Sequence, residues 1–131
     1  PIYNNPDKSD YKINIIEKSG DRLMNSLIAS EIKAISNSQS NTIFNLEFNT
    51  VFEKIIISKN AKGTVSDYQL ILRSNFVIRK GDKSETISFV EKQNIKNTSD
   101  IFEQKNYEDT IKRNFVISLV RKLNLELLTR Q

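Results

Sequence analysis

The sequence of 131 residues contains no Cys, no His and no Trp, and only three Gly and two Pro. Without Cys and His the chain lacks the usual ligands of zinc sites, cannot form a disulfide, and offers neither thiol nor His-based catalysis. Three Gly are too few for a phosphate-binding loop, and neither G-x-G-x-x-G nor G-x-x-x-x-G-K-S/T occurs. We therefore expect no enzymatic activity, no metal and no cofactor, and instead a domain that binds or assembles.

Two carboxylate pairs remain as candidates for catalysis, Glu47 with Glu53 and Glu108 with Asp109. Two carboxylates can divide acid and base roles only where a cleft separates their pKa values, and nothing in the sequence indicates a cleft. Glu108 and Asp109 are sufficiently explained by an expected helix start, where the helix dipole favours negative charge. The pairs do not change the expectation of a non-enzymatic domain.

Long hydrophobic runs are also missing: no stretch approaches 18 apolar residues, so no membrane-spanning helix is expected. The length fits one domain, residues 1–131, with a single core. The sequence starts at Pro1 rather than Met, which leaves open a cleaved signal segment or a trimmed N-terminus.

Positive charge is present but unevenly placed. The net charge is +4, whereas residues 54–83 alone carry seven basic and two acidic residues, a local +5. The basic residues of this segment are Lys54, Lys59, Lys62, Arg73, Arg79, Lys80 and Lys83. This segment is either an ordinary solvated surface or an edge that faces phosphate, nucleic acid or a phosphorylated lipid.

The first forty residues predict an extended lead-in, a strand and a helix. Residues 1–10 are polar with two Pro, and residues 12–17 form a short β-branched run typical of a strand. Apolar residues spaced by three and four over 22–37 predict an amphipathic helix, with Ser19 or Asp21 as its N-cap. The polar stretch 36–41 ends this helix.

Three strands follow with short connections. Residues 44–57, 68–79 and 86–91 alternate apolar and polar side chains, and the segments 60–64 and 80–83 contain the turn residues between them. The alternation changes phase near Glu53 and Lys54, which predicts a bulge or bend there. The three strands are expected to form an antiparallel meander.

The last element has the strongest pattern: seven apolar residues between Ile111 and Leu127 form one stripe of a helix over 106–130. The element order is therefore β-α-β-β-β-α. We predict an α+β fold in which a four-stranded sheet, the meander plus the N-terminal strand, is covered on one face by two helices.

Nucleic-acid binding would need aromatic and basic side chains on the same exposed sheet face. The strand aromatics instead alternate with the basic residues and are expected to face the core: Phe44, Phe48, Phe52, Tyr68 and Phe76. The face that carries Arg73 and Arg79 has no aromatic residue, so no nucleic-acid partner is expected.

Several short motifs resemble the lipopolysaccharide-assembly lipoprotein family, LptE. Pro1-Ile2-Tyr3 resembles the family's opening a few residues after its lipidated Cys, and Tyr68-Gln69-Leu70 with the turn 79–83 resembles a family strand. Ser99, Glu108-Asp109 and Arg113 match a pattern that leads into the family's final helix. The match is partial, because Ile101-Phe102 replaces aromatic-Ala and Thr110 replaces Ala.

The resemblance implies an outer-membrane lipoprotein on the periplasmic face, anchored through a lipidated Cys upstream of Pro1. It further implies two partners, the β-barrel protein LptD, which the family plugs and helps to assemble, and lipopolysaccharide in transit to the outer leaflet. Charge-assisted contacts to phosphates suit the basic segment. The candidate lipopolysaccharide-binding residues are Lys59, Lys62, Arg79, Lys80 and Lys83.

Two alternatives stay open at this point. The chain could be another periplasmic lipoprotein, such as an auxiliary component of an intermembrane lipid transporter. From a different class, a small nucleic-acid-binding domain would show binding that falls steeply with salt.

Overall fold

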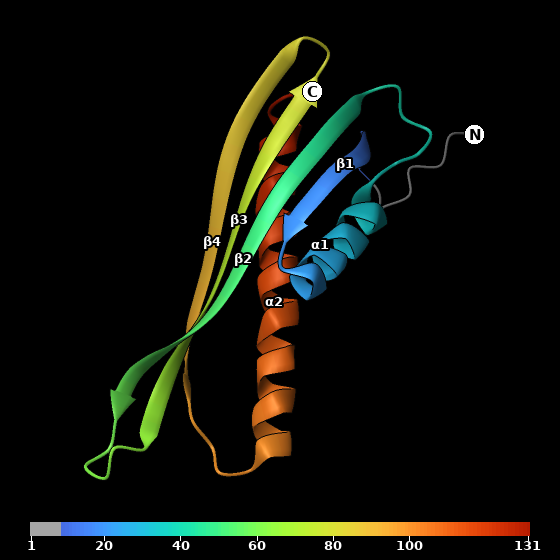
Figure 1. The fold of residues 1–131 in the computed structure, drawn as a ribbon. Helices are drawn as coiled ribbons and strands as arrows, with labels where there is room; N and C mark the ends of the chain where they lie inside the picture. The colour runs from blue at the N-terminus through green and yellow to red at the C-terminus, as the bar shows by residue number, and fades with distance from the viewer. Residues whose placement is uncertain (1–8) are drawn as a thin grey trace.

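The computed structural model describes residues 9–131 (Figure 1). The motif Pro1-Ile2-Tyr3 and most of the expected lead-in lie outside the described residues. The elements are β1 (Lys12–Gly20), α1 (Arg22–Ile35), β2 (Ile43–Lys59), β3 (Val65–Lys80), β4 (Lys83–Lys96) and α2 (Ile101–Leu128). The predicted order β-α-β-β-β-α is confirmed.

The strands form one sheet in the order β1-β2-β3-β4. β1 runs parallel to β2, and β2, β3 and β4 form the predicted antiparallel meander. Both helices lie on the same face of the sheet, and α2 runs along most of its length (Figure 1). The predicted α+β architecture is therefore confirmed.

The turn from β1 into α1 is fixed by direct contact with the backbone of β2. Gly20 has a φ of +91°, and a Cβ atom at this position would lie 2.0 Å from the carbonyl oxygen of Thr50. The next amide, of Asp21, donates to that oxygen at 2.8 Å. Asp21, one of the two predicted N-caps, accepts from the amide of Met24 at 2.9 Å. Glycine is thus required where the chain leaves the sheet.

The core lies between the sheet and the helices. All seven apolar residues of the predicted α2 stripe are buried: Ile111, Phe115, Val116, Leu119, Val120, Leu123 and Leu127. They face the aromatic side of the sheet, where the ring of Phe76 lies 5.0 Å from that of Phe48 and 5.8 Å from that of Phe89. Tyr11 is fully buried and donates to Asn124 of α2, and burial raises the pKa of Tyr11 to about 12.

The predicted bulge near Glu53 and Lys54 is wrong. The β2–β3 register is unbroken from Asn45 to Ile56, and shifts occur only around Ser58. The side chain of Lys54 lies on the helix-facing side of β2, in phase with the preceding residues, and forms an ion pair with Glu108 of α2. Beyond Lys54 both faces of β2 are partly exposed, and both carry isoleucines. The apolar–polar alternation therefore stops there, which in the sequence resembles a change of phase.

Several boundaries also differ from the prediction, and the two largest differences are at the end of β4 and the start of α2. β4 continues to Lys96 rather than ending at 91, since Ile95 is buried opposite Tyr68. α2 begins at Ile101 rather than 106, because Asp100 caps it by accepting from two backbone amides. The first turns of α2 lack an apolar stripe, so their helical character is not visible as periodicity.

Candidate binding surfaces

β3 separates the five predicted basic residues into two groups. Lys59 and Lys62 lie at the β2–β3 hairpin, whereas Arg79, Lys80 and Lys83 lie at the β3–β4 turn. These groups are at opposite ends of the 16 residues of β3, which is about 50 Å along the strand. The local +5 of the sequence is therefore two separate basic regions.

At the β3–β4 turn the charges are largely matched. Arg79 pairs with Glu47 at 2.7 Å, and Lys80 donates to the backbone oxygen of Arg130 at 3.0 Å. Lys80 and Lys83 also line an open pocket of about 610 Å³ together with Arg130. Among residues 9–131 no ion-pair partner is found for Lys83.

Arg130 is the residue that sequence reasoning missed at this site. It comes from the end of α2, about fifty positions after the turn, so only the tertiary structure brings it beside Lys80 and Lys83. Hydrogen bonds to Glu126 and Glu85 raise the pKa of Arg130 and hold its guanidinium, with nitrogen–oxygen distances of 2.9 Å and 2.7 Å. These carboxylates reduce the positive field of the pocket.

The β2–β3 hairpin is different in character. Lys59 and Lys62 are exposed, and neither has an ion-pair partner within the part of the chain that the structure describes. Both follow closely after three consecutive exposed apolar residues, Ile55, Ile56 and Ile57. Hydrogen bonds from Ser58 and Ser66 lower the pKa of Asp67. The bond from Ser58, at 2.7 Å, joins β2 to β3, and the bond from Ser66, at 3.0 Å, lies within β3. This end combines free cations with apolar side chains.

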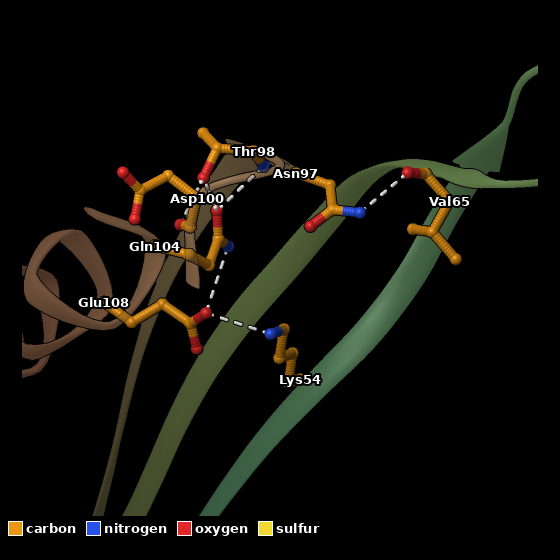
Figure 2. Close-up of polar contacts among 7 residues, drawn as sticks. All are labelled: Lys54, Val65, Asn97, Thr98, Asp100, Gln104 and Glu108. Carbon is orange, nitrogen blue, oxygen red and sulfur yellow. Dashed lines mark hydrogen bonds and ion pairs between the residues drawn. The ribbon is translucent and has the colours of Figure 1, made fainter. Parts of the chain in front are cut away.

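A polar cluster attaches the start of α2 to the sheet (Figure 2). Glu108 accepts from Lys54 at 2.9 Å and from the buried Gln104 at 3.0 Å. The side-chain oxygen of Gln104 accepts from the amide of Thr98 at 3.0 Å. In the same region Asn97 donates to the backbone oxygen of Val65 at 3.0 Å, which ties the β4–α2 loop to the hairpin.

The carboxylate pairs considered in the sequence have structural partners. Glu47 and Glu53 bind Arg79 and Arg73 respectively, so they do not form an acid–base pair. Glu108 lies two turns inside α2 rather than at its start, and it anchors Lys54. Its neighbour Asp109 pairs with Lys105 at 2.8 Å.

Residues 9–131 contain no group of three or more acidic side chains placed to hold a metal ion. The same residues include no helix that is both long and apolar enough to cross a bilayer. The aromatic residues of β2, β3 and β4 lie on the helix-facing side of the sheet, as predicted: Phe44, Phe48, Phe52, Tyr68, Phe76 and Phe89. The outer face therefore offers charge without aromatic rings for base stacking.

No family model matches the chain, and no curated protein matches it. Solved structures do. Rare lipoprotein B from Shewanella oneidensis superposes with a TM-score of 0.63 at 15% identity, over 89% of this chain and 96% of that one. This fold is shared with bacterial lipoproteins.

Two further structures support the same statement. A minor lipoprotein from Acinetobacter baumannii gives a TM-score of 0.54 at 11% identity, over 84% of this chain and 93% of that one. A lipoprotein B from Nitrosomonas europaea gives 0.52 at 14% identity, over 94% and 88%. At these identities the likeness concerns the fold, and it spans nearly the whole of each chain.

Proposed function

We propose that the chain is a non-enzymatic lipoprotein of the bacterial outer membrane that acts as LptE does, plugging and assembling the barrel protein LptD and binding lipopolysaccharide. The supporting observation is the superposition with rare lipoprotein B, which covers 89% of this chain and 96% of that one. The short motifs that resemble the LptE family point independently to the same function. In this proposal the anchor is a lipidated Cys preceding Pro1, on the periplasmic face.

The first experiment tests partner and compartment together. The full-length gene product, tagged at its C-terminus, is purified from membranes of its own host after labelling with a palmitate analogue. The proposal expects a labelled protein in the outer-membrane fraction that co-purifies with LptD. Co-purification with an inner-membrane transporter complex would instead support an auxiliary lipoprotein of lipid transport, and an unlabelled cytosolic protein would reject both.

The second experiment locates lipopolysaccharide binding. Lys59 and Lys62 are favoured over Lys80 and Lys83 of the β3–β4 turn, because they lie beside exposed isoleucines, as an anionic amphiphile requires. We expect Lys59→Glu/Lys62→Glu to reduce binding in a pull-down at least about tenfold, and Lys80→Glu/Lys83→Glu to reduce it less.

The matched control is Lys18→Glu/Arg121→Glu, which makes the same charge change at two exposed positions outside both groups. Binding should stay near that of the wild type. Equal losses in all three double variants would show that overall charge, not the hairpin, governs binding.

A further inference from the structure

β1 covers only the first half of β2. The pairing of the two strands ends where Gly20 meets Thr50, and the chain then leaves the sheet as α1 (Figure 1). β2 continues to Lys59 with β3 on one side. On its other side no strand of residues 9–131 pairs with it. We call the residues 51–59 along this side the open edge.

The hydrogen bonds of the first half show which backbone groups face the open edge. The carbonyl oxygens of Thr42 and Thr50 both accept from the β1 side, each at 2.8 Å. Along a strand, successive residues direct their N–H and C=O groups to alternate sides. The register with β3 is unbroken to Ile56. The backbone N–H and C=O groups of Phe52, Lys54 and Ile56 therefore face the same side as those of Thr42 and Thr50, which is the open edge.

In the middle of the open edge, at residues 55–57, the side chains are apolar on both faces. Ile55, Ile56 and Ile57 are 41%, 51% and 47% exposed, and no charge interrupts the segment between Lys54 and Lys59. Natural sheet edges are normally protected by charged residues, Pro or bulges along their length. The backbone groups of Phe52, Lys54 and Ile56 precede the register shifts around Ser58 and lie next to exposed isoleucines, so they make a template for an additional strand.

We propose that the open edge binds an extended segment of the partner protein, which joins the sheet as a strand beside residues 51–59 of β2. The inference rests on the proposed function, so the segment belongs to LptD. Residues 51–62 carry three Lys and one Glu, a local +2. Charge complementarity therefore favours a segment with acidic flanks over a second copy of this chain, which would bring two positively charged hairpins together.

The test removes one backbone N–H group whose loss should affect only the binding of an added strand. Ile56→Pro removes an N–H group that faces the open edge, and the hydrogen bonds to β3 do not use this group. Ile56→Ala shortens the same side chain but keeps the N–H group. In co-purification of the full-length lipoprotein with LptD, we expect Ile56→Pro to lower complex yield roughly tenfold and Ile56→Ala less than about threefold.

A second variant guards against a folding defect of the proline. Ile55→Glu/Ile57→Glu changes two half-exposed side chains, leaves the backbone intact and adds negative charges that repel an acidic segment. It should also reduce the LptD complex while circular dichroism and melting temperature stay near those of the wild type.

The outcomes distinguish a failure of the added strand from a failure of the proposed function. If the wild type and all variants bind LptD equally, the added strand is wrong and the proposed function stands. If the wild type does not bind LptD, the proposed function fails and this inference fails with it. If the purified protein forms a dimer in sedimentation that Ile56→Pro abolishes, the edge binds a second copy and the inference is overturned.

Discussion

The two halves of β2 place similar residues in different surroundings. In the first half, Phe44, Leu46 and Phe48 are buried under the helices, and β1 and β3 flank the strand. In the second half, Ile55 and Ile56 remain about half exposed, and only β3 flanks the strand. The difference shows that an alternating strand becomes core only where other elements cover it. The uncovered half is free to bind.

The largest effect should be the difference in unfolding free energy between truncating a buried side chain in the covered half of β2 and truncating an exposed one in the uncovered half. Phe44→Ala, in the covered half, removes a fully buried ring and should lower the free energy of unfolding by about 3–5 kcal/mol. Ile57→Ala, in the uncovered half, should cost about 0.5 kcal/mol or less. Urea unfolding of both variants measures this. Similar costs would mean that the hairpin is part of the core, and the comparison would fail.

A smaller difference is expected between two glycines with positive φ. A Cβ atom at Gly20 would clash with the backbone of β2, whereas at Gly63 in the hairpin turn nothing lies within 4 Å. Gly63→Ala should therefore cost about 1 kcal/mol from backbone conformation alone. Gly20→Ala should cost about 3 kcal/mol, because the strand must also shift. Equal costs in thermal unfolding would show that the clash at Thr50 is relieved easily.

The smallest effect concerns the hairpin and pH. Hydrogen bonds from Ser58 and Ser66 lower the pKa of Asp67, so the folded state prefers the ionised carboxylate. This stabilisation is complete above the ordinary Asp pKa of about 3.9 and is lost as the pH falls through the lower folded value. Asp67→Asn should be slightly less stable than the wild type in urea at pH 6, and the gap should narrow at pH 3. A constant gap would mean that these hydrogen bonds do not depend on the charge.

Local patterns predicted most of the fold, since they report which side chains are apolar. The stripe of α2 and the alternation of the covered strands gave the correct elements, order and core residues. The end of β4 was wrong because the buried Ile95 pairs with Tyr68, and the start of α2 was wrong because Asp100 caps the helix. Those interactions leave no periodic trace in the sequence.

For the candidate site, the sequence predicted only that one segment is rich in basic residues. The sequence identifies a basic segment, but an antiparallel strand carries Lys59 and Lys80 to opposite ends of the sheet. Arg130 joins the second group from the far end of the chain. The family resemblance stays a prediction for partner and ligand, and the comparison with rare lipoprotein B shows a shared fold alone.

The missing Cys and His and the scarce Gly left the sequence with few catalytic options, and the hydrophobic periodicity selected an α+β fold. These properties are local, because each depends on the chemistry of neighbouring residues. Only the tertiary structure decided that β1 ends at Gly20, opposite Thr50 of β2, and that the second half of β2 therefore has an open edge. Whether a strand is covered or free depends on where the chain turns away, and at Gly20 a contact with a strand thirty residues later fixes that turn.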